Sequence, residues 1–111
     1  MIYAKPGTDG AVVSFKERYG NFINGQWVAP INGQYFTNHS PVTGEAICEI
    51  PRSTEEDINA AIDAAEAAKG AWGKASTAER SGVLLKIADR IEEHLERLAV
   101  AETWDNGKAV R

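Results

Sequence analysis

Residues 22–28 read Phe22-Ile23-Asn24-Gly25-Gln26-Trp27-Val28, an Asn-Gly pair between two short apolar runs. Asn and Gly both tolerate positive φ angles, which the two central positions of a type I′ turn require. The strands on either side of such a turn twist in the direction that lets them pair. The stretch therefore predicts a tight β-hairpin.

Two further extended stretches follow the hairpin. One lies around residues 35–37, and the other covers residues 46–50, where apolar and polar side chains alternate. Pro41 and Thr43-Gly44 mark a turn between them, and Pro51 is expected to end the second stretch. Residues 1–52 are therefore interpreted as a hairpin and strand region with four short β segments.

The composition changes near Arg52 from Gly, Asn, Pro and aromatic residues to Ala, Glu, Leu, Ile and Lys. Ser53 and Glu56 have the spacing of a capping box, so a helix is expected to start there. Its apolar residues recur at steps of three and four and form one stripe, Ile58, Ala61, Ile62, Ala65 and Ala68. Gly70 is expected to end this helix.

Two more helices are predicted in residues 53–111. Ser76 and Glu79 form a second capping box, and the helix after them should continue to about His94. A third helix is expected from Leu95 to about Trp104, closed by Asn106-Gly107. Three helices with short loops cannot easily close a core around isolated β segments, because hairpins of this size are marginal unless they pack on something larger. The chain is therefore interpreted as a single partial α+β domain.

Charge and composition exclude several classes of partner. Of the 111 residues, 12 are basic and 16 are acidic, a formal net charge of −4. An acidic chain without a cluster of Lys and Arg does not suit nucleic acid or an anionic membrane. No apolar run approaches the roughly 20 residues that cross a bilayer. The first residues lack the layout of a signal peptide, so a cytoplasmic location is expected.

Catalytic motifs are missing from the sequence. It contains no Gly-x-Ser-x-Gly nucleophile motif and no glycine-rich phosphate cradle. The single cysteine, Cys48, lies in an apolar strand without an electropositive surround, which favours a structural thiol. His39 and His94 have no neighbour that could complete a metal site, so each is interpreted as a surface or loop residue.

Four stretches together resemble a known family. They are residues 22–28, Ser40-Pro41-Val42-Thr43-Gly44-Glu45, Lys86-Ile87-Ala88-Asp89-Arg90-Ile91, and Glu102-Thr103-Trp104-Asp105-Asn106-Gly107-Lys108. In this order and spacing they resemble the amino-terminal region of NAD(P)-dependent aldehyde dehydrogenases. Trp104 and the entry Arg18-Tyr19-Gly20-Asn21-Phe22 look like the bacterial acetaldehyde dehydrogenase branch.

The resemblance implies a place in a longer enzyme. Residues 1–111 would be an outer part of an α/β Rossmann-like coenzyme-binding domain, packed against later residues of the same chain. Family members use a cysteine thiolate, hydride transfer to NAD and a glutamate that activates water. The resemblance places those catalytic and cofactor-binding residues outside this chain, and Cys48 does not match the catalytic motif.

One site carries over by resemblance. Many family members bind a structural monovalent cation through the residue that matches Asp105 and a backbone carbonyl near the position that matches His39. Carboxylate and carbonyl oxygens suit such a hard cation. The alternative is that Asp105 is a helix-end residue that bonds its own backbone.

Two functions are therefore open at this stage. The first is an amino-terminal fragment, inactive alone, of a homodimeric or homotetrameric enzyme that oxidises short aliphatic aldehydes such as acetaldehyde to carboxylic acids with NAD. The second is a stand-alone helical interaction module without catalytic activity, because helical stripes left uncovered usually mark interfaces.

Overall fold

The hairpin around the Asn-Gly pair has the predicted turn. In the computed structural model, which describes residues 3–110, β1 (Asn21–Ile23) pairs antiparallel with β2 (Gln26–Val28). Asn24 and Gly25 join the strands with φ angles of 52° and 75°, as a type I′ turn needs. The hairpin also explains Gly20, because a Cβ there would lie 2.8 Å from the carbonyl oxygen of Val28.

The second strand pair is longer than the sequence pattern predicted. β3 (Tyr35–His39) pairs antiparallel with β4 (Ala46–Pro51). Pro51 ends β4, as expected, and as its last residue pairs opposite Tyr35. After Asn38, which faces Cys48, the register shifts so that the next pair is His39 with Ala46. This irregularity bends the ladder at the end of β3 that approaches the last helix.

The segment before the hairpin joins this sheet through Arg18. The backbone N–H of Tyr19 donates to the Glu49 carbonyl at 3.0 Å, and the Glu49 N–H donates to the Glu17 carbonyl at 2.9 Å. The guanidinium of Arg18 lies 2.7 Å from the Glu49 carboxylate and 4.0 Å from the centre of the Tyr35 ring. These contacts fix the approach of residues 17–19 to β4.

Both predicted limits of the first helix were wrong. α1 (Glu55–Lys74) has Thr54 as its N-cap and Asp57 as its capping-box partner, one residue after Ser53 and Glu56. The Asp57 carboxylate accepts the N–H of Thr54 at 2.8 Å and the N–H of Ile31 at 2.9 Å. Ile31 lies in the loop between β2 and β3. Its tertiary hydrogen bond explains why Asp57, and not Glu56, is the capping-box partner.

Gly70 lies inside α1 and does not end it. A helix-interior glycine costs about 1 kcal/mol, and the alanine-rich residues around it favour continuation. The helix stops only at Ala75, which is extended with ψ of 147° and leads into the next N-cap.

The other two helices match their predictions closely. α2 (Thr77–Glu93) begins with the expected capping box, in which the Glu79 N–H donates to Ser76 Oγ at 3.1 Å. α3 (Leu95–Asn106) follows after His94 and runs two residues past Trp104. Gly107 closes α3 in the left-handed conformation with φ of 80°.

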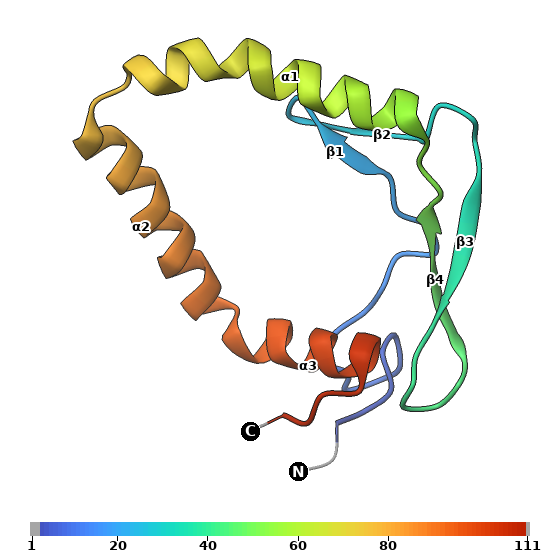
Figure 1. Cartoon of the computed structure of the whole chain (residues 1–111). Helices are drawn as coiled ribbons and strands as arrows, with labels where there is room; N and C mark the ends of the chain where they lie inside the picture. Colours follow the sequence, from blue (N-terminus) through green and yellow to red (C-terminus); the bar gives the residue numbers. More distant parts are fainter. Residues whose placement is uncertain (1–2, 111) are drawn as a thin grey trace.

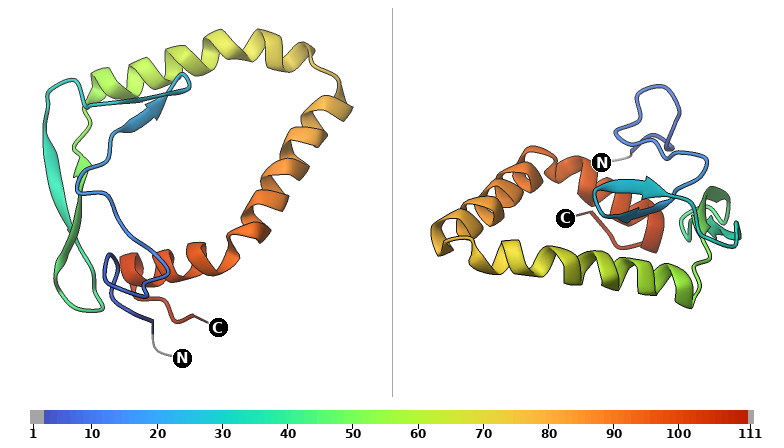
Figure 2. Two further views of the ribbon diagram at one scale, coloured as in Figure 1. Left: turned by 180° about the vertical axis from the view of Figure 1, so that it is seen from behind. Right: turned by 90° about the horizontal axis from the view of Figure 1, so that it is seen from above.

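The elements form an open ring. α1, α2 and α3 make three of its sides, β3 and β4 make the fourth, and the β1–β2 hairpin lies against α1 (Figure 1). The views from behind and from above show that the ring is flat (Figure 2), with extents of 48 × 37 × 21 Å. Its radius of gyration is 17.4 Å, whereas a compact domain of this length has about 13 Å.

The apolar core of the described residues is small. Val13 and Val100 are its buried apolar members, and Ser40 and Asp57 are the buried polar residues. The molecule exposes 8480 Å², about 2,500 Å² more than the ~6,000 Å² expected for a compact chain of this size. The expectation that these elements cannot close a core is confirmed.

Large apolar side chains on all three helices remain uncovered. They are Ile58, Ile62, Trp72, Val83, Leu84, Leu85, Ile87, Ile91, Leu95 and Leu98, each at least 43% exposed. None of the helices in residues 3–110 is long and apolar enough to span a membrane. The helical stripes predicted from the sequence therefore exist, but nothing in residues 3–110 packs on most of their area.

Candidate functional site

Two of the sequence motifs meet at one place in the ring. The β3–β4 turn contains residues 40–45, and the end of α3 contains residues 102–108. Ser40 Oγ donates to the carbonyl oxygen of Trp104 at 2.5 Å. A Cβ on Gly107 would lie 3.3 Å from Pro41 Cγ. We call this contact region, made by residues 38–41 and 104–107, the junction.

Ser40 organises the turn side of the junction. It is 1% exposed, so its polar atoms need partners within the protein. Its hydroxyl oxygen accepts the Val42 N–H at 3.2 Å, and its carbonyl accepts the Gly44 N–H at 2.7 Å. Its own N–H donates to the Glu45 carbonyl at 2.9 Å. The hydroxyl is thereby oriented to donate toward α3.

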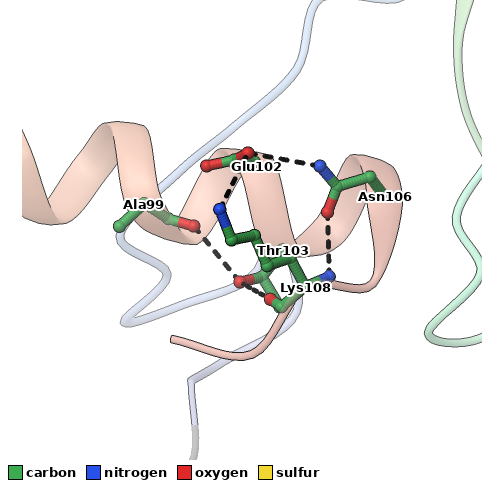
Figure 3. A network of polar contacts seen from close by, with 5 residues as sticks. All are labelled: Ala99, Glu102, Thr103, Asn106 and Lys108. Carbon is green, nitrogen blue, oxygen red and sulfur yellow. Dashed lines mark hydrogen bonds and ion pairs between the residues drawn. The ribbon is translucent and has the colours of Figure 1, made fainter. Parts of the chain in front are cut away.

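The helix side of the junction is held by a network of polar contacts at the end of α3 (Figure 3). The hydroxyl of Thr103 lies 3.2 Å from the Ala99 carbonyl oxygen and 2.5 Å from the Lys108 carbonyl oxygen. The Lys108 N–H donates to Asn106 Oδ1 at 2.8 Å. Lys108 Nζ lies 3.9 Å from the Glu102 carboxylate. The network folds residues 107–108 back onto the helix and fixes its last turn.

Asp105 extends from this last turn toward β3. Its Oδ1 accepts the side-chain N–H of Asn38 at 2.7 Å. His39 follows Asn38 directly and is the last residue of β3, with an exposed side chain. The two residues that the resemblance assigns to a cation, Asp105 and His39, therefore belong to the same junction, and the direct side-chain contact is made by Asn38.

The end of α3 at the junction carries negative charge. The C-terminal end of a helix carries a partial negative charge, and cations in its last turn stabilise it. The last turn of α3 contains Asp105 and no basic residue, which concentrates negative potential there. No group of three or more His, Cys, Asp or Glu side chains that could together hold a metal ion is found within residues 3–110.

Cys48 lies beside the junction but is not activated. It is half-buried in β4 opposite Asn38. Burial raises the pKa of the Cys48 thiol, and the nearby Asp105 carboxylate acts in the same direction against a hydrogen bond from Asn38. Because the thiolate is the nucleophile, a raised pKa makes this thiol less reactive at neutral pH. The interpretation of Cys48 as a structural residue agrees with this environment.

The N-termini of α1 and α2 do not fit a dinucleotide. A pyrophosphate binds where free backbone N–H groups and the positive helix end face it. The first turn of α1 carries Glu55, Glu56 and Asp57, and that of α2 carries Glu79. Asp57 and Glu79 already bind the N-cap backbones of their own helices. These carboxylates would repel a phosphate, so residues 3–110 do not supply a pyrophosphate site at α1 or α2.

Asn38 and Ser40 are the junction residues that sequence reasoning missed. Both lie next to His39 and just before a predicted turn, but their partners are 67 and 64 residues away. A local sequence pattern cannot predict a contact between residues so far apart in the sequence. The one available signal was that the stretches beginning at Ser40 and at Glu102 both belong to the same family resemblance.

Comparisons with known proteins agree with the resemblance. The model of the "Aldehyde dehydrogenase family" matches residues 27–111. An acetaldehyde dehydrogenase from Pseudomonas aeruginosa is 69% identical over 111 residues, which are 100% of this chain and 22% of that protein. A long-chain-aldehyde dehydrogenase from an Acinetobacter species is 59% identical over the same length and is also covered to 22%.

A solved structure gives the same result. The NAD+ complex of an aldehyde dehydrogenase from Bacillus cereus superimposes with a TM-score of 0.77 at 42% identity. The match covers 81% of this chain and 19% of that one. The chain therefore spans about a fifth of the length of the relatives that it matches.

Proposed function

This chain belongs to the aldehyde dehydrogenase family, and on that premise we propose that it is the amino-terminal, outer part of the coenzyme-binding domain of a longer enzyme. Two observations support this assignment. The chain spans 22% of its relatives' length, and it exposes about 2,500 Å² more surface than a compact chain would. The remainder of the enzyme would cover the exposed helical stripes.

The proposed activity of the whole enzyme is the oxidation of short aliphatic aldehydes, acetaldehyde first, to carboxylic acids with NAD. The observation that carries this proposal is the 69% identity to an acetaldehyde dehydrogenase over all 111 residues. The NAD+ complex of the Bacillus cereus relative supports the choice of cofactor. In this proposal the catalytic cysteine and glutamate and the NAD site belong to the remaining sequence. The proposal also takes the enzyme to be cytoplasmic and a homodimer or homotetramer, as the family resemblance implies.

A substrate series tests the proposed activity. The full-length enzyme is assayed for NADH formation with acetaldehyde and with a long-chain aldehyde, and with NADP in place of NAD. We expect a higher kcat/KM for acetaldehyde than for the long-chain substrate, and for NAD than for NADP. A preference for the long-chain aldehyde would place the enzyme with relatives such as the one from Acinetobacter and would refute the substrate proposal.

We further propose that Asp105 and the backbone carbonyl of His39 bind a structural monovalent cation in the whole enzyme. The position of Asp105 at the negative end of α3 and its 2.7 Å contact with Asn38 support this proposal. In the full-length enzyme, replacing choline chloride by potassium or sodium chloride at equal ionic strength should raise Tm.

The cation proposal has matched variants. Asp105→Asn keeps the shape of the side chain and removes its charge, so it should abolish the rise in Tm. Asp63→Asn removes an exposed charge on α1 and should leave the rise unchanged. An equal rise in Asp105→Asn would show that the cation binds elsewhere.

A stand-alone interaction module is the second candidate function. The specific observation that favours it is the uncovered apolar face of α1 and α2, because exposed apolar patches mark interaction sites. The isolated chain distinguishes the two candidates. A monomer with one cooperative melting transition and no binding of a hydrophobic dye would favour the independent module. A loosely packed or self-associating chain would favour the part of a longer enzyme.

A further inference from the structure

An apolar groove lies at the elbow between α2 and α3. Its volume is about 540 Å³. The apolar side chains that line it come from both helices and are Val83, Ile87, Ile91 and Leu98. Each of them is between 43% and 49% exposed, so the described residues leave the groove uncovered. We call it the elbow groove.

The remaining side chains that line the elbow groove all carry nitrogen. They are Lys86, Arg90, His94 and Arg97, and no carboxylate lines the groove. This is unexpected for its surroundings, because the whole chain has a net charge of −4. Of the three formal cations, Arg90 pairs with Glu93 at 2.6 Å. Within residues 3–110 no carboxylate lies within 4 Å of Lys86 or Arg97.

These features define the chemistry of an occupant. A groove lined by apolar side chains and cations is complementary to a segment that presents apolar side chains flanked by Asp or Glu. Complementary charge fixes the register of such a contact. The proposed longer enzyme supplies such a segment, because the chain spans only 22% of the length of its Pseudomonas aeruginosa relative.

We propose that an acidic amphipathic segment from the remaining sequence of the same enzyme chain docks in the elbow groove. The inference rests on the proposed function, and it adds the chemistry of the contact and the residues that make it. Lys86 and Arg97 bind carboxylates of that segment, and Ile87, Ile91 and Leu98 contact its apolar side chains.

Zero-length crosslinking of the full-length enzyme tests the contact. A carbodiimide joins a lysine amine directly to a carboxylate that already touches it. We expect mass spectrometry to find Lys86 joined to an Asp or Glu outside residues 1–111. Lys86→Arg keeps the positive charge and removes the reactive amine, so the crosslink should disappear. Lys69, an exposed lysine of α1 that pairs with Glu66, serves as the control and should not join the same segment.

Hydrogen exchange provides a second measurement. In the double variant Lys86→Glu, Arg97→Glu, we expect the backbone amides of residues 86–98 to exchange about tenfold faster than in the unmodified enzyme. Lys69→Glu should leave them unchanged. Unchanged exchange in the double variant would contradict a role for these cations in docking.

The outcomes separate the groove from the enzyme's activity. Subunits with and without ¹⁵N are co-assembled, so that a crosslink between isotopes reports docking by a second copy and overturns the proposal. Absence of any crosslink from Lys86 to sequence outside residues 1–111 also overturns it. Aldehyde oxidation is measured on the same preparation. An active enzyme without the crosslink refutes the groove assignment alone, whereas a crosslinked enzyme that does not oxidise aldehydes refutes the proposed function.

Discussion

The charge of Asp57 stabilises the start of α1 and its contact with the loop before β3. Hydrogen bonds from the backbone N–H groups of Thr54 and Ile31 hold the pKa of Asp57 below its ordinary value, and they outweigh the opposing effect of burial. A lowered pKa in the folded state means that the carboxylate stabilises the fold at pH values above about 3.9, the ordinary pKa of an unfolded Asp. This stabilisation is lost as the pH falls through the folded-state pKa.

The pH dependence gives a prediction for Asp57→Asn. In the full-length enzyme at pH 7, the variant should unfold at a lower urea concentration than the unmodified protein, because the two N–H groups lose a charged acceptor. The difference between the two midpoints should stay constant down to about pH 5 and shrink below about pH 4. Asp63→Asn, at an exposed position, should show no such change. A difference of the same size at pH 2 and at pH 7 would contradict the role of the Asp57 charge.

Substitution by alanine should have opposite effects on stability at Gly70 and at Gly107. Gly70 lies inside α1 with open space around its Cα, so Gly70→Ala should stabilise the helix by about 0.5–1 kcal/mol. Gly107 has φ of 80°, and a Cβ there would crowd Pro41, so Gly107→Ala should destabilise by about 1–2 kcal/mol. Circular dichroism during thermal unfolding measures both. A loss of helix in Gly70→Ala would mean that α1 ends at Gly70, as the sequence alone suggested.

At the scale of elements, the junction closes the ring between the β3–β4 pair and α3. Ser40→Ala removes the donor to the Trp104 carbonyl and leaves that acceptor in a partly buried place. The expected cost is about 1–3 kcal/mol. Hydrogen exchange should therefore speed up at residues 103–107. Ser14→Ala, at an exposed serine, is the matched control, and equal exchange in both variants would refute the importance of the junction.

The elements that sequence reasoning predicted well are those with local causes. Asn24-Gly25 specifies its turn through two positive φ angles, and Ser76 with Glu79 specifies the start of α2 through reciprocal hydrogen bonds. The start of α1 was ambiguous because Ser53 and Thr54 are adjacent cap residues. The N–H of Ile31, distant in sequence, is the tertiary donor to Asp57. Local patterns do not contain that information.

The junction was predicted only in part for the same reason. Asp105 and His39 were singled out through the resemblance, and both lie at the junction. Asn38 makes the direct contact with Asp105 across 67 residues. Periodicity and capping rules do not extend over that distance, so this partner could be found only in the structure.

Ile62 distinguishes the isolated chain from the whole enzyme at the scale of the molecule. Its side chain is 58% exposed on α1, so Ile62→Glu should leave the helix content of the isolated chain unchanged. In the full-length enzyme the same face is proposed to be covered, and burying an unpaired carboxylate should cost about 3 kcal/mol or more. Circular dichroism of the isolated chain and urea unfolding of the full-length enzyme measure the two effects. Unchanged stability of the full-length variant would mean that the face stays uncovered.

The assignment to a longer enzyme is tested most directly by one activity measurement. The purified 111-residue chain and the full-length enzyme are each given acetaldehyde and NAD, and the formation of NADH is followed against a buffer control. The account predicts NADH from the full-length enzyme and none above the control from the 111-residue chain, because no pyrophosphate fits at α1 or α2 of residues 3–110 and Cys48 is not activated. Turnover by the 111-residue chain alone would contradict it.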